Sequence, residues 1–306
     1  NFKTIFKKKK KINFISKINF SLKILNQERY KKNVQHLYVS RSIIFAIFST
    51  ILRKKTILEI HHNLTGFTKI IFYSAKLLGL LNNLKYIFIH KNLLKIFKVK
   101  KNDYICLDDA VNIEDFKKYK KPKKLKKTCV YVGSFHKGKG FELIQKISKK
   151  LSNINFHLYG DKKFLENHTA QKNIKVFGFI NYKDVPKILS NYNIALMPYG
   201  NSILGRIKKV NLVNYISPLK MFDYLASQNI ILASNLNVYS HILKHKKNSI
   251  LIKNSNINLW CNWINKIFKT LKKYEYIKVN AYSTAKNYTW DKRAKKIIKF
   301  SESFLA

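Results

Sequence analysis

The stretch from Ile216 to Asn235 decides the fold class of its half of the chain and reads I-S-P-L-K-M-F-D-Y-L-A-S-Q-N-I-I-L-A-S-N. Ser217 is a residue type preferred at helix N-caps. Pro218 suits the first helical position, because its missing amide hydrogen would have no helical partner there. Apolar residues then recur at helical spacing, and the run from Ile230 to Ala233 is typical of a buried strand. The stretch therefore predicts a loop, a helix and a strand of an α/β sheet.

The start of this helix is also a candidate anion site. Unpaired amide hydrogens and the positive end of the helix dipole favour a phosphate at that position. Asp223 lies about a turn and a half further along the helix. An ordinary capped helix of an α/β protein explains the same letters equally well, so this stretch alone leaves both interpretations open.

Length and composition indicate a globular protein of two domains. The chain has 306 residues, exceeds the usual single-domain range and is 46% hydrophobic. Its formal net charge is +46, which is typical of proteins that bind nucleic acids or anionic lipids. However, only five of the 61 basic residues are arginine, the residue preferred for bidentate recognition of phosphates and bases. The composition thus argues against a nucleic-acid partner and leaves weak attraction to an anionic membrane surface.

Three scattered cysteines, at positions 106, 129 and 261, form no CxxC pair. This pattern indicates neither a disulfide framework nor a zinc site, and it fits a reducing compartment. The apolar run at residues 42–52 is too short to span a bilayer, and no signal peptide is visible. We therefore expect a cytoplasmic protein, peripheral at the membrane if it binds there. Because the chain begins with Asn, we expect its natural start to be missing.

The first 126 residues show a weaker pattern than the rest. We expect helices near residues 18–25, 40–52, 68–80 and 92–98 and strands at 56–60, 86–90 and 104–107. The segment from Lys117 to Lys127 is dominated by lysine and contains Pro122, which is typical of a linker. We place a domain boundary in this segment.

Strand-like and helix-like runs alternate in the second half. The strands are expected at residues 129–132, 155–159, 175–179, 194–197, 230–233 and 249–252. The helices are expected at 140–151, 185–192, 218–226, 238–244 and 257–271, with a final helix within 288–304. Such alternation predicts a parallel sheet with helices on both faces, because parallel strands need crossover connections. Ligands of such sheets bind beyond the carboxyl ends of the strands.

The turn after the first of these strands carries a second candidate anion site. Gly133 and Ser134 end the strand, and Lys139 with Gly140 opens the next helix. Backbone amides and ammonium groups in such a loop can converge on a phosphate. The letters match neither the Walker A pattern nor the G-x-G-x-x-G fingerprint, and an ordinary strand–helix turn remains the alternative.

Several motifs occur in an order that resembles family 4 glycosyltransferases of the GT-B fold. They are V-Y-V-G-S at 130–134, K-G at 139–140, I-A-L-M-P at 194–198, S-P-L-K-M-F-D-Y-L-A-S at 217–227, I-I-L-A-S-N at 230–235, and Y-T-W at 288–290 followed by Arg293. The resemblance extends from about residue 40 to the end and is strongest between residues 129 and 235.

The resemblance implies two Rossmann-like domains that face each other across a cleft. Residues 1–126 would form the acceptor-side domain, incomplete at its start, and residues 127–285 the donor-binding domain. Residues 286–306 would form a helix that crosses back to the first domain. The implied activity is retaining transfer of a sugar from a nucleotide diphosphate sugar to a hydroxyl acceptor. The acceptor would be a glycan or lipid-linked, in envelope polysaccharide or glycolipid synthesis. No metal or other cofactor is expected, because the sequence has no D-x-D tripeptide.

The resemblance also assigns roles to individual residues. His61, at the end of an expected strand, would line the sugar or acceptor site, with His62 as a rival. A histidine that only hydrogen-bonds to a loop backbone is the alternative interpretation. The catalytic candidates are His61, Lys139 and Asp223, and the donor-binding candidates are Gly133, Ser134, Lys139, Ser217, Pro218, Leu219 and Asp223. Lys139 would neutralise the leaving diphosphate. Asp223 would replace the glutamate that accepts hydrogen bonds from the ribose hydroxyls, a task that suits a bidentate acceptor.

Some positions depart from the family pattern. Tyr215 stands where the family commonly has an earlier glutamate, and Gln228 replaces a glycine. Ser134 stands where a basic residue often helps to bind phosphate. Arg206 is a possible substitute, although a surface arginine is the simpler interpretation. These departures keep a second hypothesis open, a catalytically inactive GT-B-like module that binds nucleotides.

Overall fold

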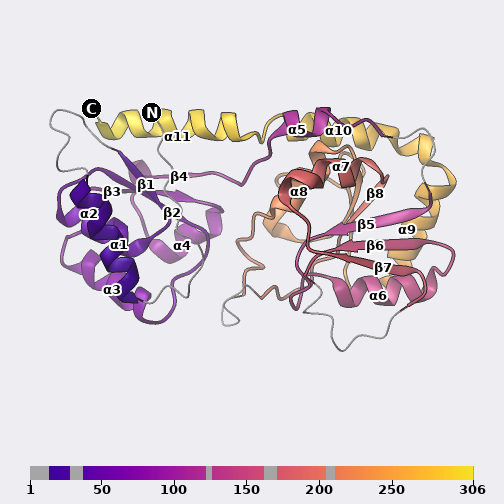
Figure 1. Ribbon diagram of the computed structural model, residues 1–306, viewed down its shortest axis with the longest axis horizontal. Coiled ribbons are helices and arrows are strands. Elements are labelled where there is room, and N and C mark those ends of the chain that lie inside the picture. The colour runs from indigo at the N-terminus through magenta and orange to yellow at the C-terminus, as the bar shows by residue number, and fades with distance from the viewer. Residues whose placement is uncertain (1–13, 28–36, 122–125, 162–170, 205–210, 306) are drawn as a thin grey trace. The chain divides into compact units, whose positions relative to one another are not determined.

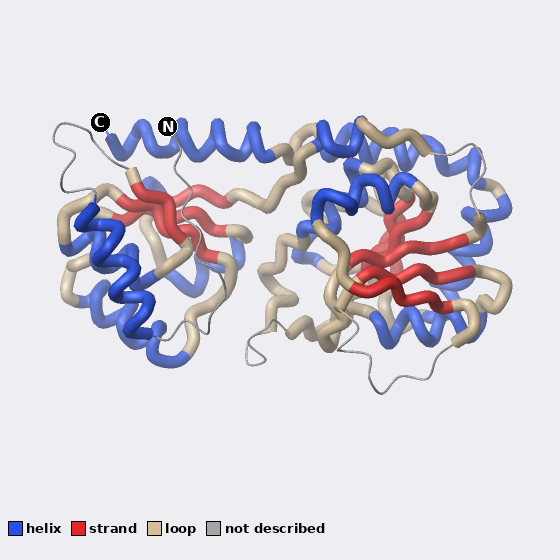
Figure 2. The backbone as a smooth tube through the Cα atoms, in the orientation of Figure 1, coloured by secondary structure: helices blue, strands red, loops and turns tan. Residues whose placement is uncertain are grey.

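The computed structural model describes residues 14–27, 37–121, 126–161, 171–204 and 211–305 (Figure 1). These residues fall into two compact units. The first unit lies within residues 1–88, 93–106 and 298–306, and the second lies within residues 89–92 and 107–297. Each unit contains a sheet of parallel strands with helices packed against it, as the tube in Figure 2 shows by colour. The expected α/β class is therefore confirmed.

The sheet of the first unit has the order β1-β2-β3-β4 among the described residues. Its strands are β1 (Tyr38–Ser40), β2 (Thr56–Ile60), β3 (Leu84–Phe88) and β4 (Tyr104–Cys106), and every pairing is parallel. The helices of this unit are α1 (Phe14–Gln27), α2 (Ile43–Ile51), α3 (Gly66–Leu77) and α4 (Leu94–Phe97). All five residues of β2 are buried, as is typical of a strand in the middle of a parallel sheet.

The sheet of the second unit has the order β10-β9-β8-β5-β6-β7, again entirely parallel. Its strands are β5 (Thr128–Val132), β6 (Asn155–Tyr159), β7 (Ile174–Gly178), β8 (Ile194–Met197), β9 (Ile230–Ser234) and β10 (Ile250–Ile252). The chain runs outward from β5 through β6 to β7 and then returns to the other side of β5 as β8. The strand order thus reverses between β5 and β8.

Helices cover both faces of this second sheet (Figure 1). One face packs on α6 (Phe141–Lys150) and α9 (Ile257–Lys269), and the other packs on α7 (Val185–Ser190), α8 (Leu219–Ala226) and α10 (Glu275–Ala285). Alternate residues of each central strand enter the two cores. Val130 lies in one core, for example, and Tyr131 in the other. This period of two follows from the pleat of the strand.

Several elements differ from the expectations. The helix expected from Pro218 begins at Leu219, and Pro218 is its N-cap. Residues 238–244, expected as a helix, contain only a 3₁₀ turn, η5 (Asn237–Tyr239), followed by turns. The side chain of Asn248 provides the reason. It accepts a hydrogen bond from the amide of Lys244 and donates one to the carbonyl of Ile242, so it replaces helical partners there.

One strand and two α-helices of the described residues were also not expected, namely β1, α10 and the short helix α5 (Ile113–Lys117). Phe116 of α5 packs in the same core as Val185 and Leu189 of α7. The compact units therefore change between Cys106 and Leu107, upstream of the lysine-rich segment. The last helix, α11 (Trp290–Leu305), has its residues from Ile298 onward in the first unit, where the ammonium of Lys85 lies 5.2 Å from the centre of the Phe300 ring.

Candidate functional site

The loops that follow β5 and β8 meet where the strand order of the second unit reverses. The amide of Gly200 donates a hydrogen bond to the carbonyl of Gly138 (2.9 Å). A Cβ atom on Gly140 would lie 2.4 Å from the carbonyl oxygen of Pro198, and the φ of Gly140 is +105°. Only glycine fits such an approach at such a φ value. In parallel α/β sheets, ligands bind at this point beyond the carboxyl ends of the strands.

A pocket of about 380 Å³ opens beside these loops, lined by residues that include Gly138, Gly140, Pro198, Gly200 and Asn254. A second cavity, of about 930 Å³, is lined by residues that include Ala226, Ser227 and Gln228, at the other end of α8. That cavity is larger, and neither of the two is lined by a candidate site residue. The strand reversal favours the smaller pocket as the ligand site.

Two lysine side chains lie near the ring of Tyr199, and that of Lys220 also lies beside Gly133. The ammonium groups of Lys139 and Lys220 each lie 5.3 Å from the centre of the Tyr199 ring. Lys220 also lies over Tyr131, with its Nζ atom 3.7 Å from the ring centre. Burial lowers the pKa of Lys139 to about 8. Burial, and then the charge of Lys139, hold the pKa of Lys220 well below its ordinary value, although Asp223 raises it somewhat.

Helix α8 is fixed to the end of β5 by Tyr224. The amide of Val132 donates a hydrogen bond to the Tyr224 hydroxyl (2.8 Å). One residue earlier, the buried side chain of Asp223 accepts a hydrogen bond from the hydroxyl of Tyr182 (2.9 Å). Burial raises the pKa of Asp223 to about 7, although the Tyr182 hydrogen bond and Lys220 oppose this shift. Asp223 is thus a carboxyl group that gains or loses its proton near neutral pH.

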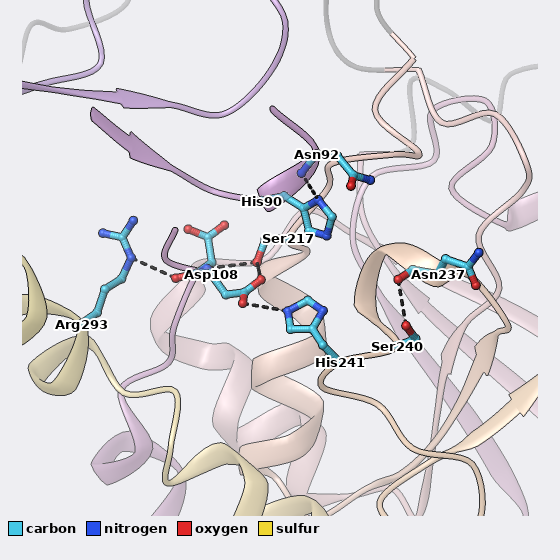
Figure 3. A network of polar contacts seen from close by, with 9 residues as sticks. His90, Asn92, Asp108, Ser217, Asn237, Ser240, His241 and Arg293 are labelled. Carbon is cyan, nitrogen blue, oxygen red and sulfur yellow. Dashed lines mark hydrogen bonds and ion pairs between the residues drawn. The ribbon is translucent and has the colours of Figure 1, made fainter. Parts of the chain in front are cut away.

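Ser217 does not act as the N-cap of α8, which corrects the expectation for this residue. Its hydroxyl oxygen instead accepts a hydrogen bond from the amide of Asp109 (3.0 Å) and donates one to a carboxylate oxygen of Asp108 (3.3 Å) (Figure 3). The other carboxylate oxygen of Asp108 lies 2.9 Å from Nε2 of His241. This network joins the loop after β4 to the start of α8 and to the turns after β9.

His90 and Arg293 extend the same network, as Figure 3 shows. The rings of His90 and His241 have their centres 5.9 Å apart. Burial, and then His241, lower the pKa of His90, whereas Asp108 raises it, and the net effect is a lowered value. The Nε atom of Arg293 donates a hydrogen bond to the backbone carbonyl of Asp108 (3.0 Å). The Y-T-W stretch lies alongside, because the amide of Val111 donates to the carbonyl of Tyr288 (2.9 Å).

His61 belongs to the first unit and lies directly after β2. Its Nε2 atom and the guanidinium of Arg41 contact the same oxygen of Glu59, at 2.6 Å and 3.0 Å. Glu59 is buried, so this carboxylate fixes the orientation of the imidazole ring. The ring of His62 contacts the carbonyl of Asn63 (2.8 Å), which is a local contact within the loop.

The structure brings most of the predicted residues together in one region of the second unit. Gly133, Ser134 and Lys139 lie in the turn after β5, and α8 is joined to that turn through Tyr224 and Lys220. Pro218 is buried at the start of α8, whereas Leu219 is 45% exposed. Arg206, the suggested substitute for a basic residue at position 134, lies outside the described residues.

Sequence reasoning assigned no role to Lys220, Tyr182, Glu59 or Asp108. A signal existed for Glu59, which is a charged residue in the otherwise apolar strand T-I-L-E-I of a chain with only 15 acidic residues. Lys220 carried a weaker signal, as a lysine in the first turn of a helix whose positive dipole end disfavours cations. Tyr182 and Asp108 gave none, because their partners are far away in the sequence.

The described residues contain neither a cluster of metal ligands nor a membrane-spanning helix. No group of three or more His, Cys, Asp or Glu side chains is arranged there to hold a metal ion. None of the helices in that part of the chain is long and apolar enough to cross a membrane.

Comparison with protein families gives one match. The model of the family described as "Glycosyl transferases group 1" matches residues 112–284, which is more than half of the chain. No sequence among the curated proteins matches this chain.

Solved structures with a similar fold are numerous, although their sequence identity is low. A glycosyltransferase from Rickettsia africae ESF-5 superimposes with a TM-score of 0.73 at 16% identity, over 98% of this chain and 84% of that one. The Anabaena protein HepE in complex with UDP superimposes with a TM-score of 0.72 at 13% identity, over 93% of this chain and 82% of that one. A sucrose-phosphate synthase from Thermosynechococcus elongatus superimposes with a TM-score of 0.71 at 12% identity, over 95% of this chain and 79% of that one.

Proposed function

This chain belongs to the group 1 glycosyltransferases and has their GT-B fold, and we propose that it transfers a sugar from a nucleotide diphosphate sugar to a hydroxyl acceptor with retention of anomeric configuration. One observation carries the proposal. The lysine pair Lys139 and Lys220 lies at the glycine turn where the strand order reverses, and such a position suits a diphosphate. The Anabaena neighbour was crystallised with UDP and with UDP-glucose, which makes uridine nucleotides the first donors to try.

In the proposed reaction, the bond between the anomeric carbon and the β-phosphate oxygen breaks while the acceptor oxygen bonds to that carbon. The acceptor's proton passes to the departing diphosphate. Negative charge develops on the leaving oxygen, and the ammonium of Lys139 together with the start of α8 would stabilise it. Gly133 and Ser134 would let the phosphates approach the backbone, and the amides near Ser217, Pro218 and Leu219 would meet phosphate or sugar. We propose that these groups act without a bound metal ion, so activity should survive treatment with EDTA.

Asp223 and His61 have separate proposed roles. Asp223 would accept hydrogen bonds from the ribose hydroxyls, a task for which its ionised form is needed. His61, held by Glu59, would line the sugar or acceptor site from the first unit. The acceptor is proposed to be a glycan or a lipid-linked glycan of envelope polysaccharide or glycolipid synthesis. The basic first domain would then rest against the anionic face of a membrane.

The test is a panel of UDP-, GDP- and ADP-sugars, with donor hydrolysis, transfer and thermal shift as readouts. Turnover with one nucleotide supports the proposal, and NMR of the product's anomeric proton reports retention or inversion. Absence of both turnover and thermal shift with every donor would remove it. Binding of a nucleotide diphosphate without any turnover would instead favour the inactive nucleotide-binding module. Tyr215 and Ser134, which stand where the family commonly has charged residues, motivate that alternative.

A further inference from the structure

The ammonium group of Lys220 is buried and has no hydrogen-bond partner among the described residues. The residue as a whole keeps some exposure, whereas the Nζ atom itself is buried. Taking an ammonium out of water is costly unless hydrogen bonds or an opposite charge compensate. The Tyr131 ring, 3.7 Å from Nζ, offers a cation–π contact, which is a partial compensation only.

The nearest charged side chains do not fully offset the cost of burying the Lys220 ammonium. Lys139 has the same sign, and its effect is to lower the pKa of Lys220. Asp223 has the opposite sign, but its carboxyl group is buried, has a pKa of about 7 and already accepts the Tyr182 hydrogen bond. Two ammonium groups thus lie near one tyrosine ring, and a bound anion would stabilise the charged form of both.

The backbone at Gly133 leaves room for the Lys220 side chain. A Cβ atom on Gly133 would lie 2.4 Å from Nζ and 2.8 Å from Cε of Lys220. Lys220 thus occupies the space beside the turn that ends β5, one residue before Ser134. It approaches this turn from the first turn of α8, which also supplies free amide hydrogens.

We propose that Lys220 is a diphosphate-binding residue that works beside Lys139 and supplies the positive charge that position 134 lacks. Its flexible stem lets the ammonium turn from the Tyr131 ring to a phosphate oxygen when the ligand enters. The inference rests on the proposed function and deepens it, because it names the groups that hold the diphosphate. A lysine that only fills space under the tyrosines is the opposing interpretation.

The experiment measures binding by isothermal titration calorimetry with three probes. Pyrophosphate carries the phosphates alone, UDP carries phosphates and a nucleoside, and uridine carries no phosphate. If another nucleotide proves to be the donor in the panel above, its diphosphate and nucleoside replace UDP and uridine. We expect Lys220→Met to weaken pyrophosphate and UDP about 10- to 100-fold, which is the usual loss for a hydrogen bond to a charged group. Uridine should bind as it does to the wild type.

Two further variants control the result. Lys149→Met removes an exposed lysine from the last turn of α6 and should bind every probe as the wild type does. Ser134→Arg in the Lys220→Met background returns a positive charge to the turn and should restore most of the lost affinity. Thermal unfolding identifies any variant that fails to fold, and in that case Lys220→Gln, which keeps a polar end, takes the place of Lys220→Met.

The outcomes separate this inference from the proposed function. Unchanged pyrophosphate and UDP affinity in a folded Lys220 variant would overturn the inference and leave the transferase proposal standing. A loss as large for uridine as for UDP would also overturn it, because it would show a structural role. Failure of the wild type to bind any nucleotide diphosphate would contradict the proposed function itself.

Discussion

Asp223 is the residue whose protonation matters most for the proposed donor site. Its buried carboxyl group has a pKa of about 7, and the hydroxyl of Tyr182 is its hydrogen-bond donor. A ribose that offers two further hydroxyl donors would favour the ionised form. Tyr182 therefore acts as a positioning residue, because its hydrogen bond lowers the pKa of Asp223 and so keeps part of the carboxyl population ionised at neutral pH.

Tyr182→Phe should weaken UDP binding in a pH-dependent way. Removal of the hydroxyl raises the pKa of Asp223. A smaller fraction of the Asp223 carboxyl groups is then ionised at pH 7, and the ribose binds more weakly. The ratio of variant to wild-type dissociation constants, measured by calorimetry, should be largest below pH 7 and fall towards one as pH rises above it. A ratio independent of pH would contradict this coupling. Asp223→Ala should weaken UDP binding by about tenfold or more above pH 7, where the wild-type carboxyl group is ionised, and by less at lower pH.

The affinity for pyrophosphate should fall as pH rises above about 8. In the free protein, burial holds the pKa of Lys139 at about 8 and that of Lys220 well below its ordinary value. A bound diphosphate favours both charged forms, so the complex carries more protons than the free protein, and high pH opposes binding. Asp223 faces Lys220 as well, and its ionisation above pH 7 favours charged Lys220. Tyr131, Tyr199 and Tyr224 stay neutral, because burial raises their pKa values.

Calorimetry in buffers of different ionisation enthalpy measures this proton uptake directly. The uptake should exceed zero near pH 8 and should fall in Lys139→Met. Binding without any proton uptake would mean that the two lysines do not contact the phosphates.

At the scale of elements, the glycine turn between β5 and α6 determines the shape of the site. Gly138 has a φ of +81°, and a Cβ atom there would lie 1.7 Å from the carbonyl oxygen of Ser202. Gly200, which bonds to the same turn, would place a Cβ atom no closer than 3.5 Å to any neighbour. The two glycines are therefore neighbours in the structure, but only Gly138 has no room for a Cβ atom.

Gly138→Ala should lower the free energy of unfolding by about 1–3 kcal/mol or more, because it combines a strained φ with a backbone clash. Gly200→Ala should change it by less than about 1 kcal/mol, since its new contacts are ordinary. Urea denaturation monitored by circular dichroism measures both values. Equal effects of the two substitutions would show that the turn relaxes easily and does not depend on glycine at position 138.

Local sequence patterns were sufficient to predict the positions of some strands. Strands β2, β6 and β8 lie at the residues that their apolar runs predicted. The prediction of a helix at 238–244 was wrong. The side chain of Asn248 takes the hydrogen bonds of the Lys244 amide and the Ile242 carbonyl from several residues away. Strand β1 has only three residues, too few for a periodic signal.

At the scale of the whole molecule, the formal charge of +46 is the dominant property. We predict that the protein co-sediments with vesicles that contain phosphatidylglycerol at low salt, because lysines near an anionic surface contribute favourable energy that salt screens. Binding should disappear at high salt and should not occur with pure phosphatidylcholine. Retention on neutral vesicles at high salt would instead require an apolar contact and would contradict the electrostatic explanation.

The sequence by itself determined the class of fold and the family of this protein. Alternating apolar runs and helical spacings are local properties, and they suffice to predict parallel strands with helices on both faces. Motif order, from Gly133 through Asp223 to Arg293, gave the resemblance that the family match at residues 112–284 confirms.

Only the tertiary structure decided how the site is built. Strand β5 pairs with β8 as well as with β6, and the hydroxyl of Tyr182 reaches Asp223 across 41 positions of sequence. Lys220 reaches the turn at Gly133 because Tyr224 joins α8 to β5. The physical reason is the same in each case. Contacts between residues far apart in the chain follow from the order of strands in the sheet, and local periodicity carries no information about that order.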